Sequence, residues 1–227
     1  MKRFQGNPIL EPVGTHEWES RRVFNAAVLN TNKKIYFLYR AIGHDGISRL
    51  GYAASSDGYR IDERLPLPVF EPANDAEKNG CEDPRLTLLD DTLVMAYTAF
   101  GNYGYQGVYQ VSLTSINIGD FLSKRWAWGE RLLVFPGIRN KDAMIFPGKF
   151  GGKYVMFHRL EPDICIARSD DFRRWYDLKF VMGPRMGSWD CWKVGAAGPP
   201  IELNEGWLFI YHGVSFEKIY SLGVALL

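Results

Sequence analysis

The sequence predicts an all-β chain folded as a β-propeller, and two observations lead to this prediction. Apolar, strand-like runs recur along the chain in pairs, separated by turn-rich segments, and no segment shows a sustained helical period. The repeat is roughly 50 to 60 residues long, which is the length of one four-stranded propeller blade. A β-sandwich is the alternative architecture. The propeller is favoured because the repeat is long, recurrent and internally alike.

Each copy of the repeat has a first long apolar run, a second run and, in two copies, a Ser/Asp-rich turn. Ser and Asp side chains cap their own backbone in such turns, as at 55–58 and 169–172. The paired runs are 34–40 with 49–54, 92–99 with 107–112, 153–159 with 163–168, and 206–212 with 220–226.

The first long run of each copy ends in a polar group. Inner strands of a propeller converge on its axis, so we expect these polar ends to build one shared pocket. They are Arg40, Thr98, His158 with Arg159, and Tyr211 with His212.

The expected domain organisation is a single β-propeller domain over residues 1–227 with an incomplete C-terminal blade. The chain stops at Leu227 inside an apolar run, so the fourth copy lacks its final strand. Either the segment 23–29 completes a small ring, or the chain is a truncated product. Truncation is favoured because an unclosed propeller leaves an exposed sheet edge.

The composition excludes several classes of protein. The net charge is +1, from 27 basic and 26 acidic residues, so bulk charge does not support a nucleic-acid or membrane-surface partner. No apolar run reaches membrane-spanning length, and the first residues show no signal core. The three cysteines lack CxxC spacing and predict reduced thiols in a cytoplasmic protein. The four histidines have no metal-ligand spacing, so we expect no metal and no cofactor.

The segment Glu82-Asp83-Pro84-Arg85 is the most informative feature of the chain. Two adjacent carboxylates are followed by a ring-locked residue and a cation, at the start of a strand-like run over 86–99. Pro84 favours an extended conformation at Asp83. We therefore expect Asp83 to be held at a strand entrance, as a positioned acid must be. The alternative is a turn with a local Asp83–Arg85 ion pair.

A set of cationic and polar groups follows along the chain and suggests an anion pocket. Arg gives a planar, bidentate fork for phosphate, whereas Lys gives a point charge. Each residue alone is more often surface charge or a satisfied core group. The set comprises Arg139-Asn140-Lys141-Asp142 before a strand, His158-Arg159 at a strand end, Trp192-Lys193-Val194-Gly195 in a Gly/Pro-rich loop, and Tyr211-His212-Gly213.

With these segments in the expected order over nearly the whole chain, the sequence resembles the mannoside phosphorylases of glycoside hydrolase family 130, of the β-1,4-mannosyl type. The resemblance implies a five-bladed propeller, here lacking the last blade, that cleaves β-mannosidic bonds with inorganic phosphate. Matching segments are 23–27, 82–85, Lys141-Asp142 with Phe146-Pro147, His158-Arg159, 192–195 with Gly198-Pro199-Pro200, and 211–214 with 220–225.

The resemblance also implies roles for individual residues. Asp83 matches the general acid, which delivers its proton through the 3-hydroxyl of the sugar. The phosphate-binding positions are Arg139, Arg159, Lys193, His212 and Tyr220. The sugar-binding positions are Asn25, Arg40, Glu82 and Tyr103, with Asn140 as a sugar or phosphate contact. The family's mannose-binding aspartate of the last blade has no counterpart in this chain, which puts ring closure and activity in question.

The residue chemistry is consistent with those roles. Inverting hydrolysis needs one carboxyl group as acid and another as base for water. Phosphate is already an anionic nucleophile, so a phosphorylase can replace the base with cations. One acid and a cation set favour phosphorolysis with inversion to α-mannose 1-phosphate. Asp83 must then be protonated to act, which requires a raised pKa.

Some residues keep two interpretations. Glu82 holds sugar hydroxyls or repels ionisation of Asp83, or else it is an exposed turn carboxylate. Arg85 is a structural ion-pair partner rather than a catalyst, and Asp142 orients a phosphate-binding cation. The expected partners are a β-mannoside oligosaccharide and phosphate, and a homo-oligomer is left open. A β-mannosidase that uses water and a non-catalytic glycan-binding propeller are the alternative functions. Tyr103, Tyr105, Trp189 and Trp192 suit stacking on sugar faces, or packing in the core.

Overall fold

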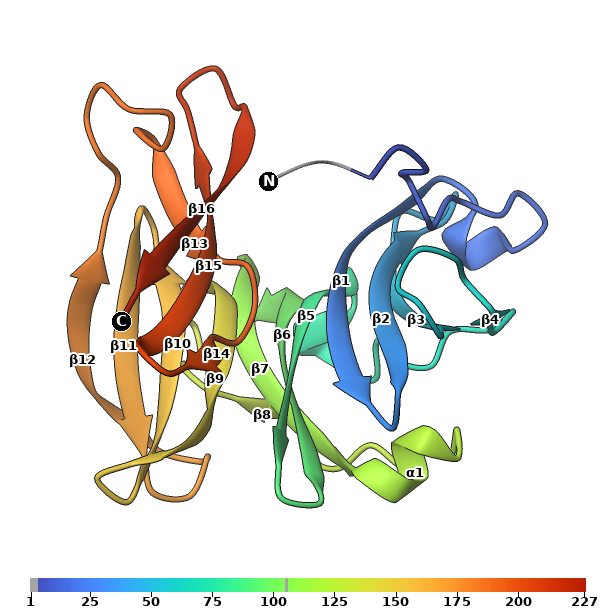
Figure 1. The fold of residues 1–227 in the computed structure, drawn as a ribbon, viewed down its shortest axis with the longest axis horizontal. Coiled ribbons are helices and arrows are strands. Elements are labelled where there is room, and N and C mark those ends of the chain that lie inside the picture. Colours follow the sequence, from blue (N-terminus) through green and yellow to red (C-terminus); the bar gives the residue numbers. More distant parts are fainter. Residues whose placement is uncertain (1–3, 105) are drawn as a thin grey trace. The chain divides into compact units, whose positions relative to one another are not determined.

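The computed structural model describes residues 4–104 and 106–227 and consists mainly of β-strands (Figure 1). It contains two compact units. The N-terminal unit comprises the chain up to Pro84 together with Ala99–Val108, and the C-terminal unit comprises Arg85–Thr98 and Tyr109–Leu227. The prediction of an all-β chain with several sheets is confirmed. Within the described residues, no helix is both long and apolar enough to cross a bilayer.

The N-terminal unit is built on an antiparallel meander, which is blue to cyan in Figure 1. A two-residue turn, Asn32-Lys33, joins the first strands with both residues at positive φ, as tight hairpins require. Phe37, Tyr39 and Ala53 form part of its buried core. The meander strands are β1 (Arg22–Thr31), β2 (Lys34–Ile42), β3 (Ser48–Ser55) and β4 (Glu63–Arg64), with short 3₁₀ turns at Glu17–Glu19 and Asp75–Glu77.

The predicted Ser/Asp turns are confirmed in the structure. Ser55 Oγ accepts from the Gly58 amide at 2.8 Å, and Asp57 Oδ1 accepts from the Tyr59 amide at 2.7 Å. The equivalent turn in the C-terminal unit uses Asp171, whose carboxylate accepts from the amides of residues 173 and 174. These side chains satisfy backbone donors that the turn leaves unpaired, which is why Ser and Asp are favoured there.

Strands β5 (Gly80–Leu89), β6 (Thr92–Tyr103) and β7 (Gln106–Asn117) are consecutive neighbours in a sheet and contribute residues to both units. The expected single run over 86–99 is wrong, because Asp90 takes a positive φ and turns the chain between β5 and β6. Asp adopts this backbone conformation more readily than most residues. Strand β8 (Leu132–Leu133) pairs with β7, and Asn117 caps the five-residue helix α1 (Ile118–Leu122).

The C-terminal unit adds an antiparallel sheet with the order β12-β11-β10-β9. Its strands contribute to two buried apolar clusters, one of which contains the edge-to-face rings of Phe146, Phe157 and Phe209. Such ring pairs contribute about 0.5–1.5 kcal/mol each beyond their buried area. The strands are β9 (Lys141–Phe150), β10 (Lys153–Leu160), β11 (Asp163–Ser169) and β12 (Trp175–Met182).

The last sheet centres on β15 (Gly206–Val214). Strands β13 (Lys193–Ala196) and β14 (Ile201–Leu203) pair with opposite halves of one edge of β15, and β16 (Tyr220–Leu226) pairs with the other edge. Lys193 was expected in a loop and instead begins β13, because backbone pairing with β15 overrides the local Gly/Pro-rich composition. The five-bladed arrangement and the single domain stay predictions.

Candidate active site

Three Asx residues (Asn or Asp) lie at positive φ in strands β1, β5 and β9, which are four strands apart along the chain. Asn25 on β1 has φ +47°, Asp83 on β5 has φ +51° and Asp142 on β9 has φ +52°. The pairing register shifts by one residue around Asn25 and again around Asp142, which marks a β-bulge at each. Bulges re-aim side chains, and backbone strain of this kind is concentrated at functional sites. The repeat therefore sets one strained Asx side chain in each of these strands.

The expectation that Asp83 is extended at a strand entrance is wrong. Asp83 lies inside β5, with a left-handed backbone that Pro84 alone would disfavour. Its side chain is held by residues distant in sequence. Asn25 Nδ2 donates to Asp83 Oδ1 at 2.7 Å, and Arg40 Nη1 donates to the same oxygen at 3.0 Å. These tertiary hydrogen bonds compensate for the unfavourable backbone conformation.

Arg40 is the centre of this network in the N-terminal unit. Its Nη2 donates to Glu82 Oε1 at 2.6 Å, and its Nε donates to Ser48 Oγ at 2.9 Å. Glu82 and Asp83 are 4% and 7% exposed, so the interpretation of Glu82 as an exposed turn carboxylate is wrong. The guanidinium also lies 4.6 Å from the centre of the Phe24 ring. Predicted sugar-binding residues and the predicted acid therefore share one buried network.

The network joins two buried carboxyl groups through one cation. Arg40 forms hydrogen bonds with both carboxyl groups, so one guanidinium positions Glu82 and Asp83 together. A rigid, buried pair of carboxyl groups can donate a proton to one sugar oxygen and accept hydrogen bonds from others.

The C-terminal unit contains a second candidate site, a cavity of about 280 Å³ rich in cations. Arg159, Lys193 and Arg139 line it as predicted, and so do Asn140 and Tyr220. Sequence reasoning left Lys141 unplaced and missed Tyr109 and Glu161. Among the described residues, the lining is formed by Tyr109, Arg139, Asn140, Lys141, Arg159, Glu161, Lys193 and Tyr220.

Asp142 anchors the cations at the back of this cavity. Its Oδ2 lies 2.5 Å from Arg159 Nη1 and 3.4 Å from His212 Nε2. Burial by itself raises the pKa of Asp142, but Arg159 and His212 together outweigh burial and hold this pKa well below its usual value. The carboxylate is therefore ionised, and it contacts Arg159 as expected of a residue that orients a cation.

Gly195 leaves the space that this arrangement needs. A Cβ at Gly195 would lie 2.4 Å from Asp142 Oδ2 and 2.6 Å from His212 Cε1, far inside contact distance. Glycine is thus required on β13 because a carboxylate from β9 and an imidazole from β15 approach its backbone.

Lys193 and Glu161 form the outer side of the cavity. Lys193 Nζ donates to Glu161 Oε1 at 2.8 Å, and Arg159 Nη2 lies 3.6 Å from the same oxygen. The hydrogen bond from Lys193 is the main cause that lowers the pKa of Glu161. The ammonium group also lies 4.4 Å from the Trp192 ring centre. The cavity therefore holds a fixed carboxylate next to its cations.

His158 does not belong to the cation set. It is fully buried, and burial lowers its pKa to about 4, so the ring is neutral at neutral pH. Its Nδ1 lies 2.9 Å from Asn140 Nδ2. The backbone N–H of Asn140 donates to the Tyr109 carbonyl at 2.9 Å. His158 thus orients Asn140 at the cavity wall and carries no charge there.

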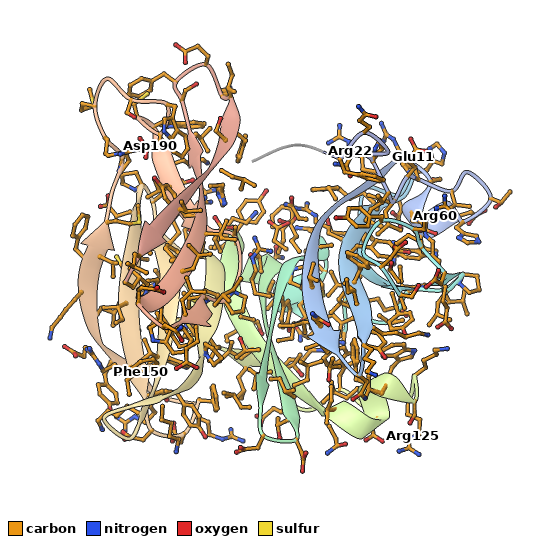
Figure 2. All side chains as sticks on the ribbon, in the orientation of Figure 1. Glu11, Arg22, Arg60, Arg125, Phe150 and Asp190 are labelled. Carbon is orange, nitrogen blue, oxygen red and sulfur yellow. The ribbon has the colours of Figure 1, made fainter. Side chains whose placement is uncertain are left out.

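The loop before β13 is fixed by Asp190, which is labelled in Figure 2. This buried carboxylate accepts from Tyr211 Oη at 3.2 Å and from Arg185 Nε at 3.0 Å. Trp189 stacks on Tyr211 with ring centres 5.7 Å apart. These contacts attach the loop to β15 and so set the start of β13, where Lys193 lies.

Some of the candidate aromatic side chains are exposed, as sugar stacking requires, and others are partly covered by neighbouring residues. Tyr220 is 62% exposed at the cavity, and its ring centre lies 5.8 Å from that of His212. Tyr103 is 49% exposed at the end of β6, where it is free to meet a ligand. Trp189 and Trp192 are partly covered by Tyr211 and Lys193. Tyr105 lies outside the described residues.

The structure therefore brings the predicted residues together in two groups. Asn25, Arg40, Glu82 and Asp83 form one network in the N-terminal unit. The predicted phosphate residues gather around the cavity of the C-terminal unit. Cys81, Cys165 and Cys191 are free thiols. The part of the chain that the structure describes has no cluster of His, Cys, Asp or Glu suited to a metal.

A buried carboxyl network can supply a proton donor and a cation-lined cavity can hold an anion, which are two functions that an enzyme of glycosyl transfer needs. The chain belongs to glycoside hydrolase family 130: the family profile, described as beta-1,4-mannooligosaccharide phosphorylase, matches residues 1–227.

Characterised relatives are found in Thermoanaerobacter sp. strain X514. A 1,2-beta-oligomannan phosphorylase is 42% identical over 235 residues, covering 100% of this chain and 76% of the relative. A beta-1,2-mannobiose phosphorylase is 40% identical with the same coverage. A solved structure of this family superposes on the chain with a TM-score of 0.85. Its report states that the family of mannoside phosphorylases contains glycoside hydrolases that target beta-1,2 mannosidic linkages in Candida mannan. That structure is 26% identical and covers 98% of this chain and 74% of its own.

Proposed function

We propose that this chain is an inverting phosphorylase that cleaves β-mannosides with inorganic phosphate and releases α-mannose 1-phosphate. The observation that carries the proposal is the cavity in which Arg139, Lys141, Arg159 and Lys193 converge. Such a cavity gathers and orients an oxyanion, and phosphate needs no base to become a nucleophile. Family membership and the phosphorylase relatives support the same reaction.

In the proposed reaction, Asp83 is the general acid. It delivers a proton to the leaving oxygen through the 3-hydroxyl of the mannosyl unit. Phosphate attacks the anomeric carbon from the face opposite the leaving group, so that the β-linkage inverts. Asn25, Arg40 and Glu82 bind the mannosyl hydroxyls, and Tyr103 supplies a further sugar contact.

The phosphate contacts come from Arg139, Arg159, Lys193, His212 and Tyr220. Arg159 and His212 are positioned for this by Asp142, which contacts both. Asn140 completes the wall with an amide oriented by His158. The neutral state of His158 suits this role, because a charged ring could not remain buried there without a partner.

We extend the proposal to linkage and fold. The relatives at 42% and 40% identity are named for β-1,2-linked substrates, so β-1,2-mannobiose is the preferred test substrate. The strand groups β1–β4, β5–β8, β9–β12 and β13–β16 follow one another along the chain and support a propeller architecture, and we infer the fifth blade from family membership.

Hydrolysis is the second candidate function. Its support is Glu161, a carboxylate in the cation cavity that could act as base for water, together with the hydrolases found in the same family. Against it, Glu161 forms a hydrogen bond with Lys193, and the surrounding cations favour an anionic nucleophile.

The deciding experiment is incubation of the protein with β-1,2- and β-1,4-mannobiose, with and without phosphate. Mannose 1-phosphate should appear only when phosphate is present, and the β-1,2 substrate should react faster. Equal cleavage without phosphate, yielding mannose alone, would contradict phosphorolysis and support the hydrolase. Sugar binding by calorimetry without cleavage under either condition would indicate a non-catalytic glycan-binding protein.

A further inference from the structure

Glu161 is a carboxylate built into a cavity that otherwise collects positive charge. It lines the cavity with Arg139, Lys141, Arg159 and Lys193. Its Oε1 accepts from Lys193 Nζ at 2.8 Å and lies 3.6 Å from Arg159 Nη2. A carboxylate at this place repels a bound anion, so we ask what Glu161 contributes to the cavity.

The protonation of the anion supplies such a reason. At neutral pH the dianion of inorganic phosphate, HPO₄²⁻, keeps one P–OH group, whereas the sulfate dianion has no proton. An ionised carboxylate only accepts hydrogen bonds, so it can accept one from the P–OH of phosphate. Sulfate has no hydrogen to donate, so its oxygens and the carboxylate repel each other. Glu161 is ionised because Lys193 holds its pKa below the usual value.

We propose that Glu161 selects protonated oxyanions, accepting a hydrogen bond from the hydroxyl of HPO₄²⁻ and excluding sulfate from the cavity. The proposal rests on the proposed function, in which this cavity binds phosphate. It assigns Glu161 a role in anion specificity, which explains why a carboxylate lies in a cavity lined by cations. Lys193 holds the Glu161 carboxylate in place, and Arg159 and Lys193 bind the remaining oxygens of the anion.

The test measures anion binding directly by calorimetry at about pH 7.5, with phosphate, arsenate and sulfate as ligands. In the unaltered protein, phosphate and arsenate, which both carry a proton, should bind at least about tenfold more tightly than sulfate. In Glu161→Gln the neutral amide can donate to sulfate, so the ratio of the sulfate and phosphate dissociation constants should fall about tenfold. Glu161→Asp, which keeps the carboxylate, should retain most of the preference.

The matched control is Glu130→Gln. Glu130 is also an exposed glutamate paired with a cation, Arg173, at 2.5 Å, but it does not line the cavity. This variant should leave the sulfate-to-phosphate ratio unchanged. The proposal is overturned if Glu161→Gln keeps the ratio of the unaltered protein, or if that protein binds sulfate as tightly as phosphate.

The same measurements separate this inference from the proposed function. If the protein binds no phosphate and makes no mannose 1-phosphate, the proposed function fails. If it makes mannose 1-phosphate but Glu161→Gln leaves the anion preference intact, the reaction stands and only the selective role of Glu161 fails.

Discussion

Gly195→Ala tests whether the approach of Asp142 and His212 organises the cation cavity. The added Cβ would lie 2.4 Å from Asp142 Oδ2 and 2.6 Å from His212 Cε1, whereas ordinary contact begins at 3.4 Å. One of these groups must therefore move by about 1 Å, or the β13 backbone must shift by as much. Asp142 is buried and ion-paired, so the group cannot move without loosening Arg159.

The expected magnitudes follow from this displacement. Overpacking of this kind costs about 1–3 kcal/mol of stability. That loss corresponds to a decrease in melting temperature of about 2–12 °C for a chain of this size. A misplacement of about 1 Å at a reacting centre lowers catalytic efficiency by about 100-fold. The KM for phosphate should rise more than the KM for the mannoside, because the displaced groups belong to the proposed phosphate site.

The assay is steady-state formation of mannose 1-phosphate at varied phosphate, together with thermal unfolding. Gly198→Ala is the matched control, because a Cβ there meets nothing within 4 Å. If Gly195→Ala shows the same phosphate KM and melting temperature as Gly198→Ala, the proposed steric basis of the cavity is wrong.

Three further predictions concern the acid, the buried anchor and pH. Asp83→Asn should lower kcat/KM on mannobiose about 10²–10⁴-fold, with a smaller loss on an aryl mannoside whose leaving group needs no proton, and an equal loss on both substrates would argue against a general acid. Asp142→Asn removes the nearer, buried counter-charge of Arg159 and should destabilise the protein by about 3–5 kcal/mol while raising the phosphate KM. Unfolding and kinetics identical to those of the unaltered protein would disprove its anchoring role. The folded-state pKa of His158, about 4, lies below its unfolded value, so its stabilising contribution is complete above about pH 6.5 and decreases as pH falls towards 4. Because of this group, the free energy of unfolding measured by denaturation should be about 2 kcal/mol larger at about pH 7 than at about pH 5. His158→Gln should remove that difference.

The all-β class and the Ser/Asp turns were predictable from the sequence. Apolar runs such as 153–159 and 206–212 carry their strand character in their own composition, and the Ser/Asp turns at 55–58 and 169–172 satisfy their own backbone. Local chemistry of this kind depends on neighbours in the chain, so it can be read from the order of residues.

The errors arose where long-range contacts outweigh local preference. Pro84 favours an extended Asp83, but hydrogen bonds from Asn25 and Arg40, 58 and 43 residues away, accompany a left-handed conformation. Lys193 lies in a segment with loop composition, yet pairing with Val214 makes it the first residue of a strand.

Residue types alone determined that this chain has adjacent carboxyl groups at 82–83 and a set of cations further along the sequence. Only the tertiary structure decided how the cations are held: Asp142 behind Arg159 and His212, an open space at Gly195, and Glu161 facing Lys193. The physical reason is that a side chain's charge belongs to its type. Its burial, its partners and its direction depend on strands that are far apart in the sequence and pair only in the folded protein.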